Sequence, residues 1–318
     1  MHVRSTATPL RTGRTLLCLV ATWVGWGSTY LAIKLALISF PPFFQVGSRF
    51  LMAGCLLMGW AWWRALPMPT ATQWRNACVI GTVMLGGTVA GATFAEQSVA
   101  SGIVVTFMAL TPALLTLGNL LFGIRPSRLE LAGITIGFAG VLLLVRGASF
   151  SASPQGLIAV VIAVLSFSLG SILSRRMFPL APGFPGYASG LVCAGLLLLA
   201  LSGLADEAPV WPPQPVALAA WWYLVLVGSV IAFSAYMTLL STTSTALASS
   251  WTFVAPVVGT LLGTSLGGES VTATELAAIG IIILGVTVLV LGRKTKRYAI
   301  PVTNNSSFRG GERLFRKE

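Results

Sequence analysis

Aromatic and hydroxyl side chains meet in one short run, Trp26-Gly27-Ser28-Thr29-Tyr30, inside a long apolar stretch. The run brings small and polar groups into the turn that follows Trp26. Small residues let a second helix or a ligand approach the backbone closely. The run therefore favours non-covalent binding in a cavity of mixed polarity, and packing of Trp26 against other helices is the alternative.

Further residues of the same types are candidates for the lining of that cavity. They are Trp23, Thr106, Phe167, Trp251 and Thr252. Buried aromatic rings are ordinary core material, and a Ser or Thr hydroxyl often bonds the backbone of its own helix. A structural role therefore stays open for each of them beside a role in binding.

Three charged residues fall inside apolar stretches: Lys34, Arg49 and Glu96. Charges within a membrane are costly and are usually functional. Each of the three lies near the expected external end of its helix. One expectation is a charge-paired gate at the outer mouth, in which Arg49 or Lys34 meets Glu96. The alternative is that the two basic side chains extend to the lipid headgroups.

Two prolines, Pro112 and Pro256, occupy matching places in the two halves of the chain. An interior proline frees a carbonyl group and kinks its helix. Bent or broken helices in matching positions are typical of transport sites. We expect a helix bend at each proline, and both a purely structural bend and a functional hinge stay open.

Catalytic chemistry is not indicated by the remaining residues. The sole histidine is His2, so a serine nucleophile would lack a histidine base. No Asp, Glu or Cys cluster has the spacing of a metal site, and no glycine-rich phosphate loop is present. We therefore expect neither an enzyme nor a bound metal or cofactor.

The elements that must position these residues are long apolar helices. Of the 318 residues, 55% are hydrophobic and only 9% are charged, and one membrane-spanning helix needs about 20 apolar residues. Long apolar runs without strand-like alternation predict helices, hence an all-α integral membrane protein with about ten spans, nine or eleven being the alternatives. The expected spans are 15–38, 42–63, 76–95, 98–123, 129–146, 156–174, 186–203, 217–238, 244–266 and 275–292.

Lysines and arginines gather at every second gap between spans, which predicts cytoplasmic N and C termini. The formal net charge of +12 follows largely from this bias, so we expect no nucleic-acid partner. The bilayer is the expected partner of the basic tail. Trp26 lies twelve positions beyond Arg14, roughly 18 Å along a helix, and thus near mid-membrane.

The chain also repeats itself. Pro256 follows Pro112 by 144 residues, and Glu275-Leu276-Ala277 follows Glu130-Leu131-Ala132 by 145. Because five spans per copy is an odd number, the second copy must enter the membrane inverted, which is a common plan of secondary transporters. The expected organisation is a cytoplasmic tail (1–14), a first repeat (15–146), an external linker (147–155), a second repeat (156–292) and a basic cytoplasmic tail (293–318).

Several motifs carry a resemblance to a known family. They are Trp26-Gly27-Ser28-Thr29-Tyr30, the two prolines, and Gly268-Glu269 before the last span. Over roughly residues 15–292 the chain resembles the EamA family of the drug/metabolite transporter superfamily, and within it the YedA-like group of inner-membrane exporters. The resemblance implies two five-helix bundles around a central cavity and export of small metabolites or drugs. One departure is Gly123-Ile124-Arg125 at the counterpart of Gly268-Glu269.

The sequence thus predicts a multi-pass inner-membrane transporter that exports a small amphipathic or aromatic metabolite by alternating access. A flippase for lipids or lipid-linked sugars is one alternative. A membrane sensor or scaffold that keeps a transporter fold is another. The identity of the substrate, the coupling ion and the oligomeric state are not encoded in any feature of the sequence.

Overall fold

A computed structural model describes residues 9–121, 123, 127–147, 153–242 and 271–291, together with positions 251, 252, 254, 255, 258, 262 and 265. Every regular element within these residues is a helix, as the apolar pattern predicts. The expected linker and tails lie mostly or wholly outside the described residues. So do Pro256 and most of the ninth expected span.

The first half of the chain contributes seven α-helices and one π-helix to this described part. The first helix begins at Pro9 rather than at the expected residue 15. A single helical segment runs through α3, η1 and α4, whereas the fourth expected span is divided between α5 and α6. The bounds are α1 Pro9–Ala36, α2 Pro42–Trp63, α3 Ala71–Ile80, η1 Gly81–Gly87, α4 Thr88–Ala95, α5 Ser101–Met108, α6 Thr111–Leu120 and α7 Arg128–Gly147.

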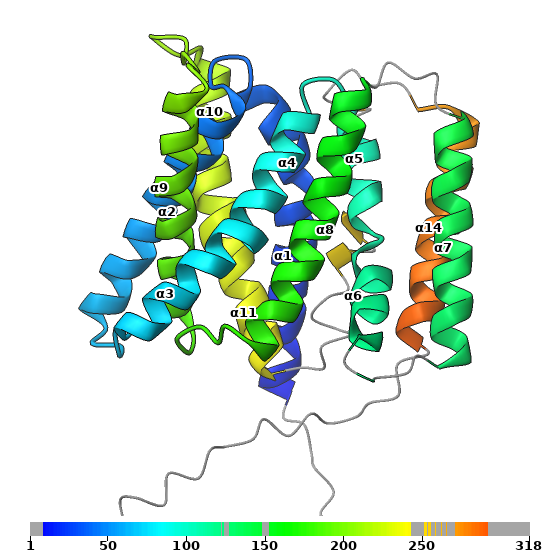
Figure 1. Cartoon of the computed structure of the whole chain (residues 1–318), viewed down its shortest axis with the longest axis horizontal. Helices are drawn as coiled ribbons and strands as arrows, with labels where there is room; N and C mark the ends of the chain where they lie inside the picture. Colours follow the sequence, from blue (N-terminus) through cyan, green and yellow to red (C-terminus); the bar gives the residue numbers. More distant parts are fainter. Residues whose placement is uncertain are drawn as a thin grey trace, which may run out of the picture.

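The described helices of the second half follow the same order of long and composite elements (Figure 1). Again one composite segment joins two α-helices through a π-helical stretch. The bounds are α8 Pro154–Arg176, α9 Phe184–Leu204, α10 Pro215–Tyr223, η2 Leu224–Ile231, α11 Ala232–Thr242 and α14 Ala273–Leu291.

Five segments of the described chain are long and apolar enough to cross a membrane. In the most apolar window of each, only 39 to 50% of the residues are buried inside the protein. Soluble proteins rarely expose so much contiguous apolar surface, so this surface fits a lipid environment. The five segments are Gly13–Ala36, Ala71–Ala95, Pro154–Ser174, Phe184–Leu204 and Pro215–Tyr236.

Local sequence signals fix where several of these helices begin. In α3 the Thr70 hydroxyl accepts a bond from the Gln73 backbone N–H, while the Gln73 side chain accepts from Thr70 N–H. Thr272 and Glu275 form the same reciprocal pair at α14. Such capping boxes satisfy the free N–H groups of the first turn. Proline also opens α2, α8 and α10, where its missing N–H costs no helical bond.

Helices α2 and α9 pack along one another at one side of the molecule (Figure 1). A Cβ added to Gly195 would lie 2.6 Å from the backbone nitrogen of Leu51, so only glycine permits this approach. In the loop after α9, the Glu207 carboxylate accepts bonds from the N–H groups of Phe43 (3.0 Å) and Phe44 (2.8 Å) at the start of α2. These contacts join the first half of the chain to the second.

A second pair, α7 and α14, stands at the opposite side of the view in Figure 1. A Cβ added to Gly285 would meet the backbone of Gly137, and one added to Gly140 would meet the backbone nitrogen of Ile282 at 2.9 Å. Small residues permit this close contact between helices in a membrane. Like α2 and α9, the two helices come from different halves and from matching places within them.

Irregular backbone recurs in the middle of the bundle. Both η1 and η2 interrupt a long helical segment, and π-helical stretches often occur at functional sites. The break between α5 and α6 falls at Ala109 and Leu110, so it ends two residues before Pro112. Proline has no N–H to continue the helical bonding across this point. The described bundle thus has three places where the regular helical ladder is interrupted.

Candidate functional site

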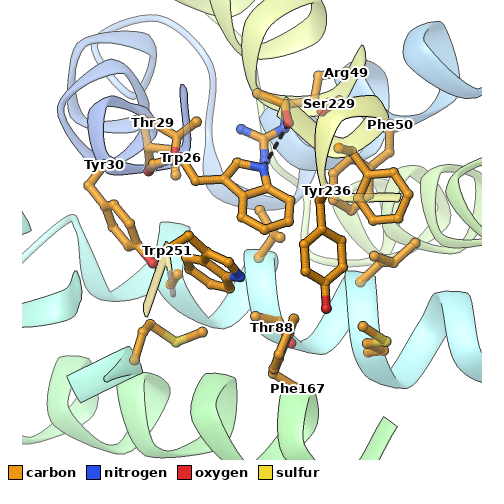
Figure 2. A pocket seen from close by; sticks show the side chains of 18 of the residues that line it. Trp26, Thr29, Tyr30, Arg49, Phe50, Thr88, Phe167, Ser229, Tyr236 and Trp251 are labelled. Atoms are coloured by element: carbon orange, nitrogen blue, oxygen red, sulfur yellow. Dashed lines mark hydrogen bonds between the residues drawn. The ribbon is translucent and has the colours of Figure 1, made fainter. Parts of the chain in front are cut away.

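A cavity of about 110 Å³ lies among α1, α2, η1, α4, α5, α8, α9, η2 and α11 (Figure 2). It is lined mostly by aromatic and aliphatic side chains, with a few hydroxyls and one arginine. Ligand sites are typically concave, largely apolar and equipped with a few polar groups. The lining residues are Trp26, Thr29, Tyr30, Ile33, Arg49, Phe50, Met84, Leu85, Thr88, Val89, Ala92, Met108, Phe167, Tyr187, Gly228, Ser229, Phe233, Tyr236 and Trp251.

Trp26 occupies the centre of the aromatic wall. Its ring centroid lies 4.5 Å from that of Trp251, 5.2 Å from that of Tyr236 and 6.2 Å from that of Phe233. Figure 2 shows Trp26, Tyr236 and Trp251 turned toward the same space. The indole Nε1 donates a hydrogen bond to the Gly228 carbonyl at 3.0 Å, which leaves the ring faces of Trp26 as its apolar contact surface.

The bond from Trp26 ties α1 to the π-helical stretch η2. A π-helical turn interrupts the regular i to i−4 bonding of an α-helix. Gly228 lies in such a stretch, and its carbonyl accepts the hydrogen bond from the Trp26 indole. The chain therefore uses an irregular stretch to orient the central ring of the cavity. A change in the backbone of η2 would move Trp26 directly.

Arg49 is the one described lining residue that carries a fixed charge. It is only 5% exposed, and its Nε and Nη1 atoms have no hydrogen-bond partner. Its guanidinium carbon lies 5.2 Å from the centroid of the Phe50 ring, which is an additional favourable contact for a cation. In Figure 2, Arg49 and Ser229 lie across the pocket from Thr88 and Phe167.

The hydroxyl groups in the cavity wall differ in whether they already have a hydrogen-bond partner. Thr29 donates its hydroxyl to the Trp26 carbonyl at 2.6 Å, within its own helix. The Thr88 hydroxyl is buried and has no partner. Buried polar groups normally find a partner, so Thr88 and Arg49 are the two lining residues whose hydrogen-bonding capacity is plainly unused.

The structure brings together many of the residues that the sequence singles out. Six of the residues proposed from the sequence for the cavity or the gate line the cavity. They are Trp26, Thr29, Tyr30, Arg49, Phe167 and Trp251. The Arg49 side chain thus forms part of the cavity wall.

Other candidates lie away from the lining. The Ser28 hydroxyl donates to the carbonyl of Val24 at 2.6 Å and lies 2.7 Å from the Tyr223 hydroxyl, so it serves helix packing. Trp23 packs against two hydrophobic clusters without lining the cavity. Buried Thr252 is likewise not a lining residue.

Two of the three gate candidates are also outside the lining. Glu96 is 4% exposed and Lys34 is half-buried, and neither contributes to the cavity wall. The side chains of Thr106 and Pro112 and the whole of Pro256 lie outside the described residues. The proposed gate and both helix bends remain predictions.

The lining residues of η1 and η2 are not among those that the sequence singles out. The lining pair Gly228-Ser229 follows the lining pair Met84-Leu85 by 144 residues, the same interval that separates the two prolines. The repeat interval, applied to residues 84 and 85, would therefore have identified the matching segment. Phe233 and Tyr236 follow one and two turns later on α11.

Comparison with known proteins identifies the family. The model of the EamA-like transporter family matches residues 13–146 and again residues 154–291. The inner membrane transporter YedA of Escherichia coli, itself uncharacterized, is 37% identical over 293 residues, covering 91% of this chain and 95% of YedA. A probable amino-acid metabolite efflux pump of Salmonella typhimurium is 24% identical, covering 87% of this chain and 94% of that protein.

One solved crystal structure shares the fold. It is 23% identical, has a TM-score of 0.65, and the match covers 89% of this chain and 99% of the other. The matching family and the Escherichia coli relative are transporters rather than enzymes. With its apolar helices and two family matches, the chain belongs to the EamA-like transporter family and is a multi-pass protein of the inner membrane.

Proposed function

We propose that this protein is a secondary transporter that exports a small amphipathic or aromatic metabolite by alternating access. The observation that carries the proposal is the ring-lined cavity around Trp26, which combines aromatic walls with few polar groups. Such a lining suits a solute that has an apolar body and a polar end. The Salmonella efflux pump adds support, because its name describes export of amino-acid metabolites.

The proposal includes ten spans in two inverted repeats, with both termini in the cytoplasm. Two separate family matches support a repeat. The recurrence of a π-helical stretch between two α-helices supports it as well, because Gly81–Gly87 and Leu224–Ile231 occupy corresponding segments. The boundaries 1–14, 15–146, 147–155, 156–292 and 293–318 belong to this proposal. An inverted repeat places a shared site near the midplane, where the halves meet.

The packing indicates which parts would move together. Helices α2 and α9 come from different halves yet pack closely, and the same holds for α7 and α14. In each pair the two helices are so close at their glycines that no side chain fits between them. Each pair would therefore move as one body. Alternating access would then tilt one mixed group of helices against the other. The interrupted segments η1 and η2, which face the cavity, would absorb the change in direction.

The test is an export measurement in cells. Cells that overproduce the wild-type protein and cells with an empty vector are compared by mass spectrometry of intracellular and external metabolites. We expect at least one small amphipathic solute to shift outward. Trp26→Ala removes the central ring and should abolish most of that shift, because the solute loses its main apolar contact.

The matched control is Trp62→Ala, since Trp62 is 76% exposed and lies outside the cavity. This variant should export as the wild type does at equal abundance in the membrane. Unchanged metabolite distribution in overproducing cells would refute the export proposal and favour a sensor or scaffold. A change confined to lipids would instead indicate a flippase.

A further inference from the structure

An unpaired cation lies in the wall of the cavity. Arg49 is 5% exposed, and its Nε and Nη1 atoms lack hydrogen-bond partners. An arginine side chain stays protonated in proteins and offers five N–H donors. Leaving a buried charge without a partner is costly, so such groups are normally paired. The observed arrangement is therefore incomplete without an acceptor.

The described cavity wall supplies no anion to complete it. The lining contains three tyrosines, three residues with aliphatic hydroxyls and many apolar side chains, but among the described residues it contains no Asp or Glu. The buried carboxylate of Glu96 belongs to the neighbouring interior and is not a lining residue. Among the described residues, then, the cavity wall leaves the acceptor for Arg49 to a molecule that enters the cavity.

The cavity also has room for a small ring. A cavity of roughly 150 Å³ with apolar walls binds benzene in an engineered protein. The volume here is about 110 Å³, which is of the same order, and the cavity is partly open, so a single small ring fits in it without the substituent having to be enclosed. The ring would lie against Trp26 and Trp251, whose centroids are 4.5 Å apart at an interplanar angle of 73°.

We propose that the cavity is a binding site for small aromatic monocarboxylates, with Arg49 as the carboxylate-binding residue. The planar guanidinium matches a carboxylate through two parallel N–H···O bonds. The ring of the ligand fills the apolar part of the cavity. This inference rests on the proposed function and names the substrate class of the same site.

The single charge in the wall also predicts what is excluded. A cationic amine would face the like charge of Arg49. A zwitterionic amino acid would gain the contact to its carboxylate, but the described lining has no carboxylate for its ammonium group. The ring faces alone attract a cation more weakly than a buried carboxylate does. Discrimination by unpaired charges is a common route to specificity.

Isothermal titration calorimetry on the purified full-length protein tests the inference. The probes are benzoate, its neutral counterpart benzamide, the cation benzylamine, and phenylalanine as the zwitterion. The wild type should bind benzoate at least about tenfold more tightly than benzamide, because hydrogen bonds to charged groups are stronger than neutral ones. Benzylamine should bind more weakly than benzamide, and phenylalanine should not exceed benzoate.

Variants assign the preference to Arg49. Arg49→Gln should lose most of the preference for benzoate while it still binds benzamide, which shows that the cavity is intact. Arg49→Lys keeps the charge but not the fork of donors, so it should retain part of the preference. Arg64→Gln is the matched control: Arg64 follows the last residue of the same helix, is exposed, and should leave all four affinities unchanged.

Three results would overturn the inference: no binding of benzoate to folded wild-type protein, equal affinity for benzoate and benzamide, or an unchanged preference in both Arg49 variants. Export measured in cells separates this failure from failure of the proposed function. If export depends on Trp26 but benzoate is not preferred, the transporter stands and the substrate class is wrong. If Arg49 binds benzoate but nothing is exported, the site stands and the transport proposal fails.

Discussion

At the scale of single residues, the sequence predicts which stretch of a helix matters better than it predicts the direction in which a side chain points. Trp26 is predicted to lie near mid-membrane from its distance to Arg14, and the structure places it in the lining of the cavity. Ser28 is only two positions away, yet its hydroxyl faces Tyr223 on α10. Successive positions of a helix point in different directions. Which direction is buried against a neighbour follows from packing partners that lie far away in the sequence.

Arg49 shows the same limit. Its place near the external end of a span made a gate or a contact with headgroups the natural expectations. The structure places the side chain in the wall of the cavity, which the sequence did not predict, and the gate stays a prediction. A single sequence gives no indication that α2 presents this position to η2 and α11 rather than to lipid. The charge itself was a sound signal, because ionisable residues within a membrane are usually functional.

Thr88 supports a prediction about stability at this scale. Its buried hydroxyl has no partner, so Thr88→Val should raise the free energy of unfolding by about 1 kcal/mol in the absence of ligand. The measurement is the thermal unfolding midpoint in detergent. Thr22→Val is the control, since Thr22 is also buried but its hydroxyl donates to the Cys18 carbonyl at 2.6 Å, so this variant should gain no stability. A loss of stability in Thr88→Val would mean that its hydroxyl is satisfied.

At the scale of elements, apolar run length was enough to locate most helices. The helical segment Ala71–Ala95 covers the expected span 76–95, and α2 has the expected bounds Pro42–Trp63. The π-helical stretches escaped prediction because apolar residues are nearly continuous there, so no change of period marks them. The break before Pro112 fits the proline signal, although it comes two residues earlier, at Leu110.

The contact between α7 and α14 gives a prediction at the scale of elements. Gly285→Val inserts side-chain atoms against the backbone of Gly137 and should separate the two helices. Overpacking of this kind costs about 1–3 kcal/mol, so the thermal unfolding midpoint should fall. Gly280→Val on the same helix is the control, because a Cβ there meets nothing within 4 Å. Equal midpoints for the two variants would contradict the close packing of α7 on α14.

At the scale of the whole molecule, the two halves of a repeated sequence share one cavity. The lining draws on helices from both halves, including Met84 from η1, Phe167 from α8 and Ser229 from η2. Composition and charge bias were sufficient for the membrane class, since they reflect the solvent rather than the detailed fold. The chemistry of the substrate needs the side-chain geometry of the cavity, which only the folded chain provides.

The central claim is that this cavity binds the transported solute. Ligand-dependent thermal stabilisation of the purified protein tests it most directly, because a ligand that binds only the folded state raises apparent stability. Wild type, Trp26→Ala and Trp62→Ala are compared against one panel of amino acids, aromatic carboxylates, aromatic cations and nucleosides. The account predicts a solute that stabilises wild type and Trp62→Ala but not Trp26→Ala. A solute that stabilises all three equally, or no stabilising solute at all, would contradict it.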